Sequence, residues 1–140
     1  MSRILPFFLI LLILGCKKTA VAEADLQYLN GYWEIDEVVF PDGSIKEYGM
    51  NPNIDFIQLT ENEGYRKKMQ PKLDGSYSTS NDIEKFSITE VSNGFALYYE
   101  NDFSDWEETL VQLDSTAFAV VNPEGITYFY KRFEPVKIPK

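Results

Sequence analysis

The chain has 140 residues, which is enough for one domain with a sizeable core and too short for two ordinary domains. Its 22 acidic and 13 basic residues give a formal net charge of −9, which argues against a protein whose main partner is the nucleic-acid backbone. The chain has no histidine and one cysteine, so histidine-based catalytic sites, an intrachain disulfide and Cys-rich metal clusters are all excluded.

The N-terminal segment has the layout of a secretory signal. Arg3 supplies one positive charge, and an apolar run over 4–14, interrupted by Pro6, leads to Gly15 and Cys16. This run is about half of the roughly 20 apolar residues that a membrane-spanning helix needs. The tetrapeptide Ile-Leu-Gly-Cys at 13–16 resembles the lipobox of bacterial lipoproteins, which implies that Cys16 is lipidated with a diacylglyceryl group and becomes the new N-terminus. The alternative is an ordinary signal peptide that ends near a cysteine.

The lipobox resemblance predicts a location as well as a modification. Acyl chains such as palmitate hold a protein on a membrane through ~0.8 kcal/mol per buried methylene. In lipoproteins of two-membrane bacteria an Asp after the cysteine often marks retention in the inner membrane, and here that position is Lys17. We therefore expect a signal peptide over 1–15, a tether over 16–24, and an envelope protein anchored at the outer membrane.

A short helix is predicted after the tether. Leu26 and Leu29 stand at helical spacing over 23–29, and Asn30 and Gly31 supply a stop signal. We place the domain at 25–134, with this helix at its start.

The chain beyond Gly31 is rich in aromatic and β-branched residues, with turn formers about every ten positions. The connection over 41–53 is longer than the others and could hold a short strand or a lid. The predicted strands are 32–40, 54–59, 65–70, 76–80, 83–89, 95–101, 106–113, 117–122 and 126–133.

Short connections between successive strands predict an antiparallel meander. A meander of eight or nine strands leaves two edges exposed unless it closes on itself. We therefore predict an all-β fold: an antiparallel, up-and-down barrel of eight to nine strands with a short N-terminal helix, in preference to an open sandwich.

Alternating residues predict which side chains face the core. In 54–56 the apolar Ile54 and Phe56 alternate with Asp55, which predicts that Asp55 faces outward. In the first strand the apolar positions change parity after Ile35. Either a bulge lies near residues 36–37, or Glu37 points inward.

The start and the end of the domain carry the residues of a known family. A short helix runs into Gly31-Tyr32-Trp33, and a late arginine, Arg132, stands on the last strand. This arrangement resembles the lipocalin fold, and more specifically the lipocalin-like domains of bacterial lipoproteins, over about 26–133. The resemblance implies that Trp33 packs at the closed end of the barrel with Arg132 across its ring, both as structural residues; Lys131 is the alternative to Arg132.

The interior of an eight-stranded barrel can be filled by side chains or hold one small molecule. The aromatic residues fit either a plain core or a lined cavity. If a cavity is present, we expect a small hydrophobic ligand, with Glu37 as a buried polar contact. The candidate ligand-binding residues are Ile35, Glu37, Phe56, Leu97, Tyr99, Leu110, Tyr128 and Tyr130.

Catalytic, metal and cofactor signals are weak. Glu107 and Glu108 are neighbours on one strand and face opposite ways, so they do not form a working pair. Asp102 and Asp105 lack the further ligands of a calcium loop. The basic cluster over 66–68, with Lys72, fits either headgroup or acidic-partner contacts or a charged strand edge. We predict no catalytic residue, no metal, no cofactor and no enzymatic activity.

The sequence therefore favours a lipid-anchored envelope lipoprotein whose barrel binds or carries a small hydrophobic molecule. The alternative is a non-catalytic envelope interaction or inhibitor protein with a side-chain-filled barrel. No nucleic acid is expected as a partner, and the sequence names no protein partner.

Overall fold

A computed structural model describes residues 21–49, 52–79 and 82–134. The predicted signal peptide (1–15) and the lipidation site Cys16 lie outside the described residues, as does the tether up to residue 20. The elements are η1 (Glu23–Leu29), β1 (Gly31–Val39), β2 (Ile45–Glu47), β3 (Ile54–Thr60), β4 (Glu63–Pro71), β5 (Tyr77–Thr79), β6 (Glu84–Val91), β7 (Gly94–Glu100), β8 (Asp105–Leu113), β9 (Ala117–Val121) and β10 (Thr127–Arg132).

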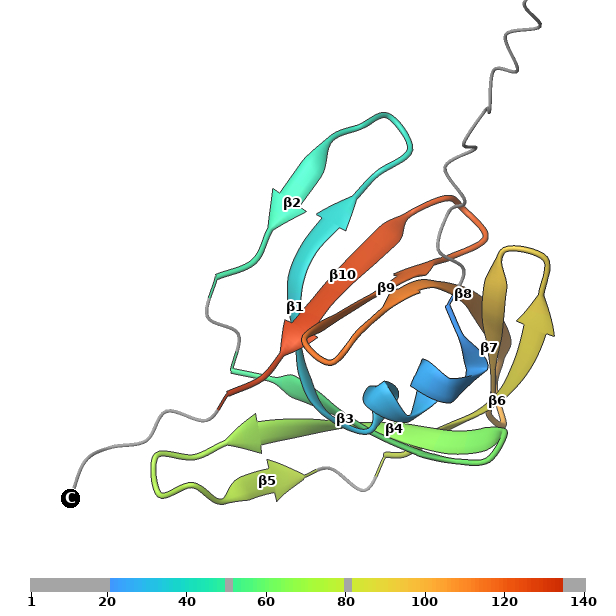
Figure 1. Cartoon of the computed structure of the whole chain (residues 1–140). Helices are drawn as coiled ribbons and strands as arrows, with labels where there is room; N and C mark the ends of the chain where they lie inside the picture. Colours follow the sequence, from blue (N-terminus) through green and yellow to red (C-terminus); the bar gives the residue numbers. More distant parts are fainter. Residues whose placement is uncertain (1–20, 50–51, 80–81, 135–140) are drawn as a thin grey trace, which may run out of the picture.

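Eight strands form a closed antiparallel barrel. Hydrogen-bonded neighbours follow the order β10-β9-β8-β7-β6-β4-β3-β1, and β10 pairs with β1 to close the ring (Figure 1). The predicted fold class is confirmed, and the closure excludes an open sandwich. The long connection over 41–53 was expected to hold either a short strand or a lid. It holds a short strand, β2.

Two short strands extend the barrel at one end. β1 pairs with β3 through residues 31–33 and with β2 through residues 37–39. In the same way β4 pairs with β6 through residues 63–66 and with β5 through residues 69–71. β1 and β4 both run toward this end of the barrel, so the β1–β2 and β4–β5 hairpins extend the barrel wall at the same end (Figure 1). We call it the open end.

The opposite end is closed by the helix. η1 is a 3₁₀ helix that contacts β3 and β8, two strands on opposite sides of the ring, so it crosses the barrel end (Figure 1). It buries Leu26 and Leu29 against the core. Among the described residues, no helix is long and apolar enough to cross a lipid bilayer.

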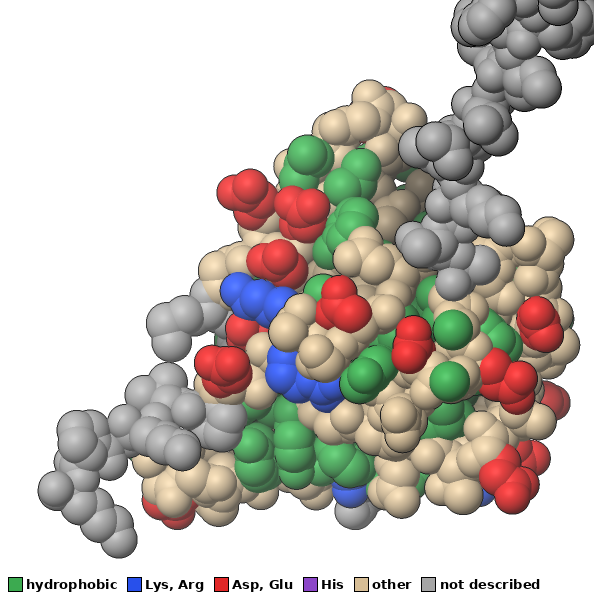
Figure 2. All heavy atoms as spheres, viewed as in Figure 1, with side chains coloured by type: hydrophobic (Ala, Val, Ile, Leu, Met, Phe, Trp, Pro, Cys, Tyr) green, Lys and Arg blue, Asp and Glu red, His purple; other side chains and the backbone are tan. Residues whose placement is uncertain are grey.

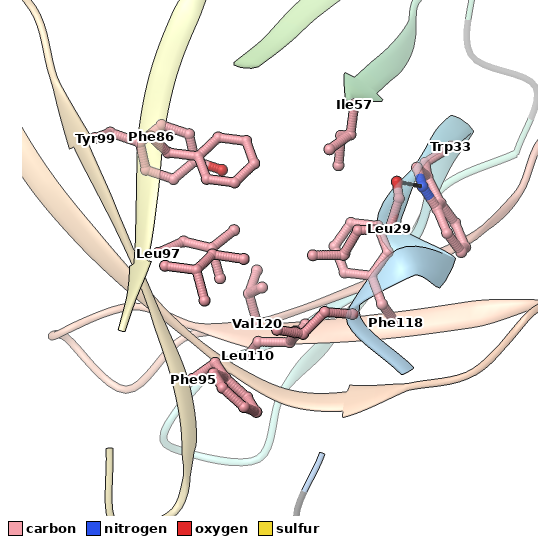
Figure 3. Close-up of a cluster of buried hydrophobic side chains, with 12 residues drawn as sticks. Leu29, Trp33, Ile57, Phe86, Phe95, Leu97, Tyr99, Leu110, Phe118 and Val120 are labelled. Carbon is pink, nitrogen blue, oxygen red and sulfur yellow. Dashed lines mark hydrogen bonds between the residues drawn. The ribbon is translucent and has the colours of Figure 1, made fainter. Parts of the chain in front are cut away.

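The closed half of the interior, between this helix and the middle of the barrel, is packed with apolar side chains. Figure 3 shows Leu29 and Trp33 on one side of this core and Phe95 and Leu97 on the other. Trp33 is fully buried, and its ring meets Phe118 edge-on at 4.7 Å between centroids. Such dense packing makes this closed half a structural core. Its fully buried members are Leu29, Trp33, Ile57, Leu97, Leu110, Phe118 and Val120.

Two bulges set which side chains face inward. The register of β1 against β10 shifts between Ile35 and Glu37, which confirms the bulge predicted in the first strand. After the shift Glu37 pairs with Phe129, opposite in parity to the inward Tyr128 and Tyr130, so Glu37 lies on the outer face. The second shift lies between Leu110 and Gln112 in β8.

The predicted facing of β3 is wrong. Asp55 pairs with the buried Trp33, so it faces the interior, and Phe56 pairs with Tyr32 on the outer face. The outer face is itself aromatic here, because Tyr77 of the β4–β5 hairpin stacks on Tyr32 at 4.8 Å. An apolar residue in β3 therefore finds packing partners on both sides of the wall, and alternation does not reveal which side is inside.

Candidate functional site: the open half of the barrel

The open half contains a buried ionic cluster in place of an apolar core. Arg66 of β4 donates from Nη2 to Oδ2 of Asp55 at 2.8 Å, and both side chains are buried. Lys68 places its Nζ 2.7 Å from the other carboxylate oxygen of Asp55. Because Asp55 and Lys68 are cross-strand partners, and Arg66 pairs with the inward Ile57, the cluster lies on the interior face.

The cluster fixes the charge states of its members. Burial alone would raise the pKa of Asp55, but the positive charges of Arg66 and Lys68 outweigh burial and hold that pKa below its usual value. Burial opposes the charge of Arg66, yet Tyr130 and Asp55 beside it raise the pKa of the guanidinium well above its usual value. Both groups are therefore ionised, as a buried pair must be to offset its desolvation.

Aromatic rings surround the guanidinium. Arg66 lies over the ring of Tyr130, with Cζ 4.9 Å from the centroid, a favourable contact for a cation. The Tyr99 ring stacks on Trp106 at 5.1 Å with an interplanar angle of 4°. Burial raises the pKa of Tyr99, so its hydroxyl stays protonated beside Arg66. These rings form an aromatic wall above the closed core.

Glu108 is the second buried acid of the open half. It pairs with Leu97, which places it on the interior face of β8. Its Oε2 is buried and has no hydrogen-bond partner among the described residues, because the nearest cation, Nη1 of Arg66, is 3.9 Å away. Burial raises the pKa of Glu108; the charge of Arg66 reduces this shift, and the carboxylates of Glu84 and Asp55 add to it. Its carboxylate is therefore only partly compensated.

A cavity of about 400 Å³, here called the rim cavity, opens beside Glu108. β8 extends past the end of β9, and the β9–β10 turn stands next to it, so the barrel interior meets solvent at this point. Trp106, Glu108 and Tyr128 contribute their inward-facing side chains to the wall. The full lining is Trp106, Glu107, Glu108, Asn122, Pro123, Glu124 and Tyr128.

Other hollows in the described part of the chain include two of a different kind. A groove of about 530 Å³ runs along the outer face of the barrel and is lined by Lys85, Ser87, Tyr98 and their neighbours. A smaller hollow of about 190 Å³ lies against the ionic cluster, between Asp55, Arg66, Lys68 and Glu84. Neither hollow is both walled by inward-facing aromatic rings and open to the barrel interior, as the rim cavity is.

The closed end shows the contact that the lipocalin resemblance implies. The guanidinium carbon of Arg132 lies 3.7 Å from the centroid of the Trp33 ring. The Trp33 indole donates to the carbonyl oxygen of Leu29 at 2.8 Å (Figure 3), and Arg132 donates to the carbonyl oxygens of Tyr28, Asn30 and Ser115. Lys131, the alternative residue, instead lies near Glu34 and Asp36 on the outer face.

The predicted ligand-binding residues fall into two groups. Phe56 and Glu37 lie on the outer face, so the structure does not bring them to the interior. The other six face inward, but Leu97 and Leu110 belong to the packed closed half. The members that reach the open half are Ile35, Tyr99, Tyr128 and Tyr130.

Four residues of the open half were not selected from the sequence: Asp55, Arg66, Trp106 and Glu108. Trp106 and Glu108 alternate with the inward Leu110, so parity along β8 could have placed both inside. Arg66 and Lys68 face the interior, whereas Lys67 pairs with Phe56 on the outer face. The predicted basic cluster is thus divided across the barrel wall.

The described residues contain no group of three or more Asp, Glu, Cys or His side chains placed to hold a metal ion. Asp102 and Asp105 belong to the exposed β7–β8 connection, where Asn101 caps the turn by accepting from the amides of Phe103 and Ser104. Glu107 and Glu108 lie on opposite faces of β8, in accordance with their adjacent positions. The chemistry that this arrangement offers is recognition: ring stacking, a buried guanidinium and an incompletely paired carboxylate.

The fold and the site define an up-and-down β-barrel with one plugged end and one polar, aromatic end. Several solved structures are similar to this chain, among them the following three. A lipocalin-like protein from Bacteroides uniformis has 11% identity and a TM-score of 0.47, covering 76% of this chain and 99% of its own. An uncharacterized protein from Bacteroides eggerthii has 12% identity and a TM-score of 0.47, covering 75% and 99%. A de novo designed fluorescence-activating β-barrel has 18% identity and a TM-score of 0.46, covering 81% and 100%.

No protein-family model matches the chain, and no curated protein matches it. The fold assignment therefore rests on the strand pairing of the chain itself.

Proposed function

We propose that this protein is a lipid-anchored lipoprotein of the cell envelope that binds a small, largely hydrophobic molecule at the open end of its barrel. The observation that carries the binding role is the rim cavity, walled by Trp106 and Tyr128 where the interior meets solvent. Its volume of about 400 Å³ lies within the range of roughly 300–1,000 Å³ that is usual for small-molecule sites.

The division of the barrel supports this location. The closed half is filled by side chains and plugged by η1, so a ligand has no space there. The open half keeps aromatic surface that is only partly buried, at Trp106, Tyr128 and Tyr130. Aromatic rings supply large apolar contact area at a small cost in side-chain entropy, which suits them to a ligand wall.

We assign the cavity a binding role and no catalytic role. The two acids at its wall that are adjacent in sequence, Glu107 and Glu108, face opposite sides of β8, so they do not act on one substrate atom as an acid–base pair. Asp55 is held in its ion pair with Arg66 and Lys68.

The anchoring part of the proposal is supported by the sequence. The lipobox-like residues 13–16 end at Cys16, and Lys17 occupies the position after it, which favours the outer membrane. We expect the mature chain to begin at a Cys16 that carries a diacylglyceryl group, visible in its intact mass. A Cys16→Ser variant should leave the membrane fraction; a variant that still sediments with outer membranes would contradict the anchor.

Native mass spectrometry of the protein purified from its own membranes tests the binding role. We expect a small molecule bound to the folded protein. Trp106→Ala should lose it, whereas Tyr98→Ala should retain it, because Tyr98 is an exposed aromatic on the outer face of the neighbouring strand. Preparations without any bound molecule, or equal retention by both variants, would contradict the proposed function.

A second candidate function, an envelope interaction protein, is favoured by the outer face. Tyr32 contacts Phe56 at 5.0 Å and stacks on Tyr77, and Phe56 contacts Tyr65 at 6.1 Å. Figure 2 shows hydrophobic side chains gathered on the lower part of the molecule, over β3 and β4. A photo-crosslinking residue in place of Tyr77 would capture a defined protein in intact envelopes if this face is an interface, whereas the same residue in place of Thr89 on β6 would not.

A further inference from the structure

The wall of the rim cavity is acidic as well as aromatic. Three of its seven lining residues are glutamates, Glu107, Glu108 and Glu124, and none of the seven is basic. Glu107 and Glu124 are exposed to solvent, where their charges are well hydrated. Glu108 differs from them, because its side chain faces the barrel interior and is only 16% exposed. The cavity therefore has a buried carboxylate among its aromatic rings.

Glu108 has a long ion pair with Arg66 in place of a close one. Its Oε2 is buried and has no hydrogen bond from the part of the chain that the structure describes, and Nη1 of Arg66, at 3.9 Å, is beyond hydrogen-bonding distance. Arg66 already donates to Asp55 at 2.8 Å. A buried carboxylate oxygen without a hydrogen bond costs free energy, and a donor or a cation placed beside it would recover that cost.

The nearby positive charges do not make the cavity favourable for an anion. Arg66 and Lys68 share one carboxylate, Asp55, at 2.8 and 2.7 Å. With Glu108 included, this cluster has no excess of positive charge, and Glu107 and Glu124 leave the cavity as a whole negative. The carboxylates of Glu108 and Glu124 in the lining therefore disfavour an anionic ligand.

The aromatic rings of the wall also favour a cation. Tyr99 covers one face of the Trp106 ring, and Trp106 is only partly buried, so part of its ring surface remains available. Tyr128 on β10 provides a second partly buried ring. A positive charge near such rings gains about 0.5–2 kcal/mol from the ring quadrupole, and the apolar part of the same molecule gains from contact with them.

We propose that the ligand of the rim cavity is an organic cation: an apolar or aromatic group that carries a protonated amine, with Glu108 as its counterion and Trp106 and Tyr128 as its aromatic contacts. This inference rests on the proposed function, since it names the chemical class of the molecule bound at the same site.

Three probes that share one apolar frame test the proposal: 4-phenylbutylamine, 4-phenylbutanol and 4-phenylbutyrate, which are cationic, neutral and anionic at pH 7. Each is titrated into the full chain reconstituted in phosphatidylcholine nanodiscs, with empty nanodiscs as the blank for partitioning into lipid. We expect the amine to bind at least tenfold more tightly than the alcohol, and the carboxylate to bind most weakly.

Two variants locate the charge preference. Glu108→Gln should weaken binding of the amine about tenfold and leave binding of the alcohol unchanged. Glu90→Gln, which alters an exposed acid on β6 outside the cavity, should change neither affinity. The circular dichroism spectrum of Glu108→Gln checks that the barrel is intact.

The outcomes separate this inference from the proposed function. Equal binding of all three probes, preference for the carboxylate, or an unchanged amine preference in Glu108→Gln would overturn the cation while leaving a binding cavity in place. Failure of all three probes to bind would overturn the inference together with the proposed function on which it rests.

Discussion

The two halves of the barrel interior are built from different chemistry. The closed half is apolar, and its polar groups are satisfied: the Trp33 indole donates to Leu29, and Arg132 donates to three carbonyl oxygens. The open half buries Arg66, Asp55 and Glu108, and Oε2 of Glu108 is left without a hydrogen bond among the described residues.

This difference indicates where stability and function lie. A buried ion pair is weak evidence for stability, because well-packed apolar residues of similar volume are often as stable. An incompletely paired buried polar group in a native structure needs an explanation, and a bound ligand is one that the rim cavity offers. The closed half therefore accounts for folding, and we propose that the open half accounts for recognition.

The largest expected effect comes from the closed half. Trp33→Ala should destabilise the protein by about 4 kcal/mol, because it removes a fully buried ring, its contact with Phe118 and its contact with Arg132. Chemical denaturation measures the loss. If this variant does not fold, Trp33→Phe, with a loss of about 2 kcal/mol, keeps the test available. The folded Trp33→Phe variant should keep its ligand affinity. A large change in affinity would contradict the assignment of ligand binding to the open half alone.

Breaking the ionic cluster should have the next largest effect. Arg66→Met removes the main partner of the buried Asp55 carboxylate and should cost about 3 kcal/mol. Adding Asp55→Leu should restore part of that loss, since the stranded Asp55 carboxylate is removed while Glu108 still lacks the nearby charge of Arg66. Lys67→Met, the neighbour on the outer face, should change stability by less than about 0.5 kcal/mol. A double variant as unstable as Arg66→Met would show that the loss is not due to the stranded acid.

Arg132→Lys should cost about 2 kcal/mol. Lysine keeps the positive charge near Trp33 but cannot donate in the fixed geometry with which the guanidinium reaches Tyr28, Asn30 and Ser115. Lys131→Arg, on the outer face, is the matched control and should have almost no effect. Thermal unfolding of both variants measures the difference, and equal transition temperatures would contradict the role assigned to Arg132.

The smallest effect has the opposite sign. Burial raises the folded-state pKa of Glu108, so its ionised form costs stability at pH 7, and Glu108→Gln should stabilise the protein slightly. The gain should shrink as the pH falls from the raised folded-state pKa toward the unfolded-state pKa, below which Glu108 is protonated in both states. Asp55, with a lowered pKa, instead contributes stability that is present above its unfolded pKa and lost as the pH falls through its folded pKa. Urea denaturation of the wild type and of Glu108→Gln from pH 7 to pH 3 separates the contribution of Glu108 from that of Asp55. A Glu108→Gln variant that is less stable than the wild type at pH 7 would contradict the cost assigned to the buried carboxylate.

Local patterns revealed much of the fold, and non-local contacts explain what they did not. The order of most strands follows from turn residues, and the bulge after Ile35 follows from a change of parity in β1. The strand predicted over 76–80 is an exception: β4 pairs with β6 in the ring, and β5 lies beside β4 off the ring. The facing of β3 depends on Tyr77, which lies far along the chain and makes the outer face apolar beside Phe56.

The candidate site was predicted less completely than the fold for the same reason. The Asp55–Arg66 pair joins two strands, and neither residue by itself indicates a buried partner. Glu108 becomes informative only when Arg66 is seen to be engaged by Asp55.

The chain has two tryptophans, one in each half, and their indole N–H signals in a ¹H–¹⁵N correlation spectrum test the central claim directly. On titration of the full chain in nanodiscs with 4-phenylbutylamine, the Trp106 signal should shift to saturation while the Trp33 signal stays in place. A Trp33 signal that moves as far as that of Trp106, or two signals that do not move at any concentration, would contradict the assignment of recognition to the open half.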